Sequence, residues 1–384
     1  MNVLFIIQNY STYDGSSLVL YEYIKNNPLI QSYKIICRKI LSKQEDLVIE
    51  EVSNKNKLKK VLNEKNYDLV HYFKTLGYEL FNWAFTNNNK NLPIITTVCQ
   101  RPSKIGMLLS PNEIKYSRHI IFIDKSSYQD PLYYFIPKDI KSVIYFGRNE
   151  ENIKTTQRII EEYTPDNDTI IFGRGSSLNK CPLDLIDIFD QIQIKNKKLI
   201  IAGINKGSWI EKKYWNREDI IIYPPSDYIS WLKLCNTFDI FLYYLPLDTH
   251  SSIDGTLGDA MILEKPCIYY GPGAPKERFT NGEDGFICET KDDLIKWANI
   301  LGKDQELRKN IGKNARKSII RNFPLKKTID SYNQLYSRVI KDNEISTHHI
   351  PLSFILYFYR HSIRQFLRYV ISGTTLERKF SVYK

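Results

Sequence analysis

Two cations and two glycines lie where an apolar run ends in the middle of the chain. The stretch IIFGRGSSLNKCPLDLIDIF, residues 170–189, contains Gly173, Arg174, Gly175 and Lys180 before an apolar-periodic segment. Where a strand passes into a helix, glycines let a ligand approach and helix N–H groups bind anions. Arg supplies a planar fork for phosphate oxygens and Lys a compact charge. These residues predict a diphosphate site, with a solvated basic loop as the alternative; the spacing is neither G-x-G-x-x-G nor a P-loop.

The balance of charge points to an anionic partner. The chain has 384 residues, enough for two domains, and carries 54 Lys+Arg against 43 Asp+Glu, a formal net charge of +11. Nucleic acid, anionic lipid and phosphorylated small molecules all fit this charge. The basic residues form no stripe interleaved with aromatics, so we expect no nucleic-acid partner.

The cysteines and the first residues indicate a cytoplasmic protein. The six cysteines are scattered without a C-x-x-C pair, which favours neither a disulfide framework nor a zinc site and fits a reducing compartment. MNVLFIIQNY reads as a buried strand instead of a signal peptide. No stretch reaches the ~18 apolar residues of a membrane-spanning helix.

Short apolar runs alternate with helix-length segments in the first 150 residues. Continuous apolar runs separated by helices are typical of a parallel sheet covered on both faces. The expected strands are 2–7, 34–37, 68–73, 93–98, 119–123 and 142–146, and the expected helices include 16–27, 54–65 and 76–88.

A second series of the same kind follows a polar connection. We expect a linker at 151–168 and further strands at 169–172, 198–202, 219–223, 239–243, 266–270 and 285–288. Helical segments at 181–193, 227–236, 255–264, 291–302 and 304–322 separate them. The pattern predicts an α/β chain of two Rossmann-like doubly wound domains, residues 1–150 and 169–340, facing across a cleft that holds the ligand.

The remaining residues, 341–384, form a basic tail. From Ile345 to Lys384 there are six Lys/Arg and one acid. A helix over 352–371 would gather apolar residues on one face, with three arginines beside it. The apolar residues are Leu352, Ile355, Leu356, Tyr359, Ile363, Phe366, Leu367 and Val370, and the arginines are Arg360, Arg364 and Arg368. A basic amphipathic helix predicts contact of residues 350–371 with an anionic membrane; packing on the protein itself is the alternative.

Two segments carry a resemblance to a known family. FGRGSSLNKCPLDLIDIF is similar to the element G-R-x-x-x-x-K-G, and DGTLGDAMILEKPCIYYGPGAPKERFTNGEDGFIC, residues 254–288, to G-x-x-x-x-E-A-M-x-x-G-x-P-V…G-x-x-E-x-x-x-x-G-x-x-G-x-L. Over residues 1–340 the chain resembles nucleotide-sugar glycosyltransferases of the group 1, family-4 type. The resemblance implies the two-domain GT-B fold and transfer with retention of configuration.

The resemblance also assigns roles to charged residues. It makes Arg174 and Lys180 the catalytic cations that neutralise the donor diphosphate, although the spacing is one residue longer and Cys181 replaces a glycine. Asp259 takes the place of the second acid of an E-x7-E pair, which binds the donor ribose. The first acid of the pair, which normally contacts the donor sugar, is missing, and Ser251 stands at its position. Its loss bears on which sugar is bound and on activity. Either His250 or Asp254 compensates for it, or both are loop residues.

Further donor-site and acceptor-site positions follow by the same comparison. The donor-binding set comprises Gly15, Ser16, Gly173, Pro225, Tyr228, Ser251, Gly255, Thr256 and Asp259. Cys99 and Gln100 stand where the family often has a histidine. Gln100, Arg101 and Lys104 would serve the acceptor, or form an exposed loop. We expect His71 and His119 to be structural.

The sequence predicts no metal or other cofactor. The DND triplet, residues 166–168, precedes a strand and reads as a turn. We expect a hexosyltransferase that uses a nucleoside-diphosphate sugar as substrate and a saccharide or lipid-linked saccharide as acceptor. Surface polysaccharide assembly (capsule or lipopolysaccharide), on the inner face of the cell membrane, would suit the basic tail. The alternatives are a catalytically silent GT-B binding module and a nucleotide-sugar 2-epimerase of the same fold.

Overall fold

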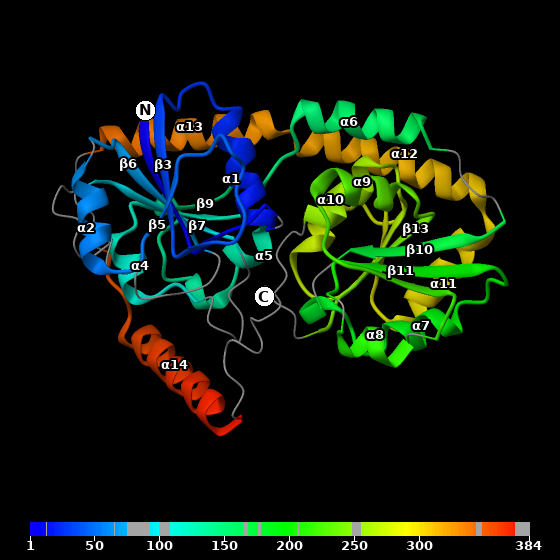
Figure 1. Ribbon diagram of the computed structural model, residues 1–384. Coiled ribbons are helices and arrows are strands. Elements are labelled where there is room, and N and C mark those ends of the chain that lie inside the picture. The colour runs from blue at the N-terminus through cyan, green and yellow to red at the C-terminus, as the bar shows by residue number, and fades with distance from the viewer. Residues whose placement is uncertain are drawn as a thin grey trace. The chain divides into compact units, whose positions relative to one another are not determined.

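The chain forms two α/β units in the computed structural model (Figure 1). Unit 1 comprises Met1–Gly147 and the segment that begins at Leu325 and includes helix α14 (Leu352–Ser372); unit 2 comprises Arg148–Pro324. The structure describes residues 1–12, 14–64, 66–74, 92–99, 108–163, 168–175, 178–205, 207–214, 216–247, 255–342 and 348–372. The expected helix at 76–88 lies outside these ranges.

A parallel sheet forms the centre of unit 1. Its described strands run in the order β5-β3-β1-β6-β7-β8-β9, so the order reverses between β1 and β6. The bounds are β1 Asn2–Ile7, β3 Ser32–Cys37, β5 Ile49–Glu51, β6 Leu69–Lys74, β7 Ile94–Val98, β8 His119–Phe122 and β9 Lys141–Val143, with a small pair β2 (Asn9–Tyr10) and β4 (Lys39–Ile40) beside it. The doubly wound prediction is confirmed, and the edge strand β5 was not expected.

Helices cover both faces of this sheet. They include α1 (Gly15–Lys25), α2 (Lys55–Glu64), α4 (Pro111–Tyr116), α5 (Lys125–Tyr128) and α13 (Leu325–Lys341). Along β1, Val3, Phe5 and Ile7 join the cluster with α1 and α13, while Leu4 and Ile6 join the cluster with α2. This alternation is the two-residue period of a strand that is buried on both sides.

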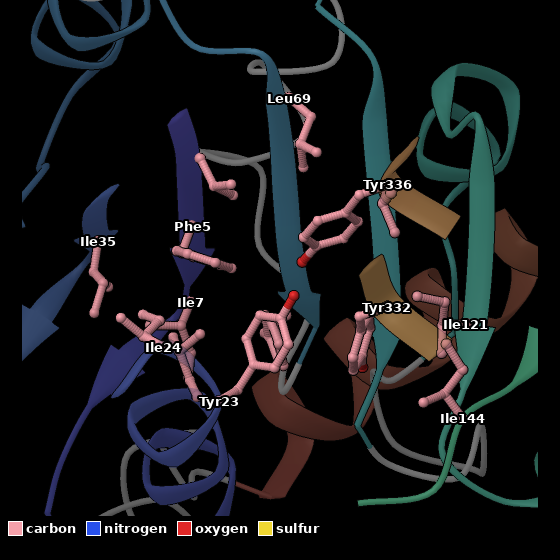
Figure 2. Packing of buried hydrophobic residues seen from close by; sticks show 14 of the residues in the cluster. Phe5, Ile7, Tyr23, Ile24, Ile35, Leu69, Ile121, Ile144, Tyr332 and Tyr336 are labelled. Carbon is pink, nitrogen blue, oxygen red and sulfur yellow. The ribbon is translucent and has the colours of Figure 1, made fainter. Parts of the chain in front are cut away.

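Helix α13 belongs to unit 1, although the sequence placed residues 325–340 in the second domain. Its buried side chains include Leu325, Ile329, Tyr332 and Tyr336. Figure 2 shows Tyr332 and Tyr336 beside Tyr23 of α1, and the Tyr23 and Tyr332 ring centroids are 5.0 Å apart. Pro324 separates α13 from α12 (Gln305–Asn322), and the domain boundary falls there.

Unit 2 has a second parallel sheet. Its described strands run β12-β11-β10-β13-β14-β15, with the reversal between β10 and β13. The bounds are β10 Ile170–Gly175, β11 Lys197–Ala202, β12 Ile220–Tyr223, β13 Ile240–Tyr244, β14 Cys267–Tyr270 and β15 Phe286–Cys288. The helices include α7 (Leu185–Gln191), α8 (Trp209–Tyr214), α9 (Tyr228–Asn236), α10 (Gly255–Ile262) and α11 (Lys291–Lys303). These strands match the predicted series.

The expected linker at 151–168 is largely a helix. Helix α6 (Glu150–Glu161) starts at the N-cap Asn149 and packs within unit 2. Asn236 Nδ2 donates to the Ile159 carbonyl at 2.8 Å, and Arg316 Nη1 donates to Thr156 Oγ1 at 3.1 Å. The prediction was wrong because α6 buries few apolar side chains and is held by polar contacts instead.

The tail forms the expected helix, α14. Phe354 is buried against Tyr133 and Phe135 of unit 1, with the Phe135 and Phe354 ring centroids 4.8 Å apart. In the part of the chain that the structure describes, no helix is both long and apolar enough to cross a membrane.

Candidate functional site

The carboxyl ends of β10 and β13 lie side by side in unit 2. Phe172 of β10 pairs with Ile240 of β13, and the strand order reverses between these two strands. In doubly wound sheets, ligands bind outside the carboxyl ends of the strands at such a reversal. β10 ends beside Arg174, and helix α10 follows β13 in the chain, so this edge of the sheet is the candidate site.

Arg174 is a fully buried cation at this edge. Its Nη1 donates to the carbonyl of Tyr244 at the end of β13, and its Nη2 donates to the carbonyl of Lys180. Among the described residues no carboxylate pairs with this guanidinium, and its Nε has no acceptor. Buried charges are normally neutralised by a partner. Arg174 therefore holds the segment of Lys180 in place and keeps a positive charge that a bound anion would compensate.

The two glycines of this stretch do not make room for a ligand. Both lie in β10, which runs three residues beyond the predicted strand. A Cβ on Gly173 would lie 2.0 Å from the Phe238 ring, and one on Gly175 would lie 2.2 Å from the Trp231 ring. These glycines let the Phe238 and Trp231 rings pack closely against β10, and a donor contact at Gly173 stays a prediction.

Asp259, the predicted ribose ligand, is buried in α10 and has three partners. Its Oδ1 accepts from the Tyr228 hydroxyl at 3.0 Å and lies 3.1 Å from Arg148 Nη2. Its Oδ2 accepts from Trp231 Nε1 at 2.9 Å. The structure thus brings the predicted Tyr228 and Asp259 together, in direct contact with each other.

The first turn of α10 contributes Gly255 and Thr256, as predicted. Gly255 is exposed at the start of the helix, where backbone N–H groups lack intrahelical partners. The Thr256 hydroxyl is buried and has no hydrogen-bond partner among the described residues. A helix start with a buried free hydroxyl is suited to an anion.

A charged network supports the same edge from α7. The Tyr244 hydroxyl donates to Asp184 Oδ1 at 2.7 Å, and Lys291 pairs with Asp184 Oδ2. Burial, and next the hydrogen bond to Asp184, raise the pKa of Tyr244 to about 12. Although burial opposes it, hydrogen bonds from Lys291 and Tyr244 lower the pKa of Asp184. The network holds Tyr244 in place, and the Tyr244 carbonyl accepts the hydrogen bond from Arg174 Nη1.

Sequence reasoning missed two residues of this site, Arg148 and Trp231. Arg148 also donates from Nη2 to the Gly255 carbonyl, 107 residues along the chain. The only signal was a lone arginine after a strand, in FGRNEE. Trp231 lies one turn after the N-cap Asp227 of α9, in a segment whose helix the sequence did predict.

Several predicted positions have no described contacts at this site. Pro225 is exposed ahead of α9. Ser251, His250 and Asp254 lie outside the described residues, as do the acceptor-side positions Gln100, Arg101 and Lys104.

In unit 1, the predicted positions lie at the start of α1. Gly15 is exposed, and among the described residues no atom lies within 4 Å of the position of a Cβ. Ser16 follows it and is half-buried, and Asp14 caps the helix by accepting from the Ser17 N–H at 3.0 Å. The open surface at Gly15 leaves space for a ligand.

A buried ion pair lies at the carboxyl end of β6. Lys74 Nζ donates to both carboxylate oxygens of Glu113 at 2.9 Å. Glu113 Oε2 also accepts from the Ser110 N–H at 2.6 Å in the capping box of α4. The pair ties the end of β6 to α4.

The two histidines of interest are structural, as predicted. His71 is buried between Thr97, whose Oγ1 lies 2.7 Å from Nε2, and the Tyr336 hydroxyl, which meets Nδ1. Burial lowers the pKa of His71 to about 3. His119 is buried with Nε2 2.9 Å from Ser142 Oγ, and burial lowers its pKa to about 4.

The cysteines and the acids form no metal centre in the described part of the chain. All six cysteines are buried and free. Within the ranges that the structure describes, no three His, Cys, Asp or Glu side chains are grouped so that they could hold a metal ion.

Comparisons with known proteins give one family match and one curated relative. Residues 152–318 match the family model of glycosyl transferases group 1. N-acetyl-alpha-D-glucosaminyl L-malate synthase of Bacillus anthracis is 32% identical over 102 residues, which are 26% of this chain and 27% of that protein.

Solved structures show the same fold. The Anabaena protein Alr3699/HepE, in complex with UDP-glucose, superposes with a TM-score of 0.68 at 16% identity, covering 88% of this chain and 100% of that one. WaaG, a glycosyltransferase involved in lipopolysaccharide biosynthesis, superposes with a TM-score of 0.65 at 11% identity, covering 87% and 99%. Residues 152–318 thus match the group 1 glycosyl transferase family, and the chain shares the fold of these glycosyltransferase structures.

Proposed function

We propose that this protein transfers a hexose-type sugar from a nucleoside-diphosphate sugar to an acceptor hydroxyl, with retention of configuration and without a metal ion. The observation that carries the proposal is the buried Arg174, whose charge has no carboxylate partner among the described residues. Its Nη2 donates to the Lys180 carbonyl, and α10 follows the strand β13 whose last carbonyl, that of Tyr244, accepts from its Nη1. A diphosphate would compensate the charge of Arg174 and use the anion-binding groups of α10.

The donor belongs to the uridine series. The Anabaena structure with the same fold holds UDP-glucose, which supports this choice. The ribose binds the carboxylate of Asp259, and Tyr228 lies beside it as a packing surface for the base.

The reaction relies on electrostatics. Arg174 and Lys180 stabilise the negative charge that develops on the departing diphosphate. A preorganised donor at such a place lowers the activation free energy by about 3–4 kcal/mol. An oxygen of the diphosphate accepts the proton of the acceptor hydroxyl. With two cations on the leaving group, a divalent ion is not required. Closure around the substrates holds the acceptor near the anomeric carbon and excludes water.

Binding of nucleotide sugars tests the donor site. We expect UDP-sugars, and not GDP-, ADP- or dTDP-sugars, to raise the unfolding temperature of the wild-type protein. Lys180→Gln should weaken UDP binding about 10-fold or more, because a charge-assisted contact to phosphate is lost. Titration calorimetry measures the affinity.

Lys195→Gln is the matched control, since Lys195 is exposed in the turn before β11. It should bind UDP as the wild type does. If no nucleotide sugar stabilises folded wild-type protein, the proposal fails and the chain is a silent binding module.

The acceptor is a lipid-linked saccharide of surface polysaccharide assembly. The protein is cytoplasmic and binds the inner face of the cell membrane, where it meets this acceptor. Helix α14 supports this part of the proposal. Four of its apolar side chains, Leu352, Leu356, Tyr359 and Ile363, are all more than half exposed and recur every three or four residues. Arg360 lies beside this stripe, and the helix holds no acid, so it is complementary to anionic lipid. The described role of WaaG in lipopolysaccharide biosynthesis is in line with such an acceptor.

Sedimentation with vesicles tests the membrane contact. The full chain should pellet with vesicles of phosphatidylglycerol and phosphatidylcholine, and far less with phosphatidylcholine alone. Leu356→Ser/Ile363→Ser should reduce the bound fraction at least 10-fold, because each buried leucine-sized side chain contributes about 1.5–3 kcal/mol.

Leu183→Ser is the control, since Leu183 is an exposed apolar residue of unit 2. Unchanged pelleting of the α14 variant would contradict a membrane role. If the wild-type protein has the mass of a dimer in solution and Leu356→Ser/Ile363→Ser has that of a monomer, a second copy of the chain covers the stripe instead of a membrane.

A further inference from the structure

Arg148 lies over the start of α10, where the proposed donor diphosphate binds. It is the first residue of unit 2, and its backbone N–H donates to the Phe323 carbonyl at 2.8 Å. Its guanidinium donates to the Gly255 carbonyl and pairs with Asp259. Its side chain remains 18% exposed, so a ligand can reach it.

The contact depends on a glycine in α10. A Cβ on Gly258 would lie 2.5 Å from Arg148 Nη2 and 3.0 Å from its Nε. Any other residue at this position would displace the guanidinium from the helix. Gly258 therefore admits Arg148 to the first turn of α10.

A cation at this place is electrostatically unfavourable without an anion. The N-terminus of a helix carries a partial positive charge that repels a guanidinium. In the free protein the carboxylate of Asp259, with Oδ1 3.1 Å from Arg148 Nη2, offsets this repulsion. A diphosphate at the helix start would relieve the same repulsion, and its oxygens would accept hydrogen bonds from two N–H groups of the Arg148 guanidinium.

Asp259 has too few free acceptor sites for a ribose while Arg148 is bound. A carboxylate offers about four lone-pair sites. Tyr228 and Arg148 occupy two on Oδ1, and Trp231 occupies one on Oδ2. One site is left, whereas the two hydroxyls of a ribose need two.

We propose that Arg148 is a donor-binding residue that exchanges partners. In the free protein it neutralises Asp259; when the donor binds, its guanidinium moves to the diphosphate and frees Oδ1 of Asp259 for the second ribose hydroxyl. This inference rests on the proposed function. It adds a third cation, contributed by the start of unit 2, to Arg174 and Lys180.

The exchange predicts opposite effects on two ligands. In Arg148→Gln the affinity for UDP should fall about 10–100-fold, because a charge-assisted bidentate contact is lost. The affinity for uridine, which has no phosphate, should stay the same or increase, because Asp259 is no longer occupied. Titration calorimetry of the full chain with UDP and with uridine measures both.

Two further variants complete the test. Arg148→Lys should recover part of the UDP affinity, and Arg217→Gln, which removes an Arg–Asp contact elsewhere in unit 2, should change neither ligand. Equal losses for UDP and uridine would overturn the exchange and leave Arg148 with the role of positioning Asp259. Unchanged UDP binding in a folded Arg148→Gln protein would remove it from the site. Wild-type protein that binds neither ligand would instead refute the proposed donor site, and the role of Arg148 with it.

Discussion

Replacing Arg174 by methionine is expected to destabilise unit 2 and to abolish UDP binding at once. The buried carbonyl of Tyr244 and the partly buried carbonyl of Lys180 would each lose a donor, at a cost of about 1–3 kcal/mol for each group. Removal of the desolvated charge offsets part of this, so the net loss is about 2–3 kcal/mol. For a unit of this size that lowers the unfolding temperature by about 4–12 °C. Scanning calorimetry resolves the transition, and titration calorimetry measures UDP binding.

Arg217→Met provides the comparison, because Arg217 is a partly exposed arginine of the same unit that contacts Asp190 and Asp219. An exposed ion pair contributes only about 0–1 kcal/mol, so this variant should unfold close to the wild-type temperature and bind UDP normally. An Arg174→Met protein as stable as the wild type would show that the two carbonyls find other donors.

The second large effect is expected at the buried pair of Lys74 and Glu113. Lys74→Met strands a carboxylate that is 1% exposed, which typically costs 3–5 kcal/mol, about half the stability of an ordinary domain. The transition of unit 1 should move accordingly, while that of unit 2 stays in place. Calorimetry of the full chain separates the two.

The double variant Lys74→Met/Glu113→Gln tests the cause. It removes both charges, and the glutamine retains an oxygen for the Ser110 N–H in the capping box of α4. It should recover most of the stability lost in Lys74→Met. A double variant as unstable as the single one would assign the loss to packing of the lysine stem instead of to the unpaired charge.

The strands were predictable because their signal is local. Runs such as NVLFII and KLIIA are apolar without alternation, and only a strand covered on both faces requires this. The three-residue strand β5 was missed, since IEE at a sheet edge shows no such run. The membership of α13 was missed for a different reason: an amphipathic helix does not encode which sheet its apolar side chains will meet.

The site was predictable in its position and less so in its contacts. Arg174, Lys180, Tyr228 and Asp259 were placed on segments that the structure does bring to one edge of the sheet. The residues that contact them are far away in the sequence. Nothing in the sequence next to Arg148 indicates that its side chain lies against Gly258. The glycines of β10 show the converse problem. Glycine marks a close approach, but the sequence does not tell whether a phosphate or an aromatic ring comes close, and here Phe238 and Trp231 do.

The return of α13 to unit 1 has a consequence for the order in which the chain matures during synthesis. The described part of unit 2 is one continuous segment, and all its strands are synthesised before Leu325. Unit 1 begins first, yet the cluster around Phe5, Tyr23 and His71 lacks Tyr332 and Tyr336 until then. A nascent chain thus contains the described part of its later unit before it contains the last helix of its earlier one. Until α13 arrives, the part of this sheet face that α1 does not cover stays open to water and to chaperones.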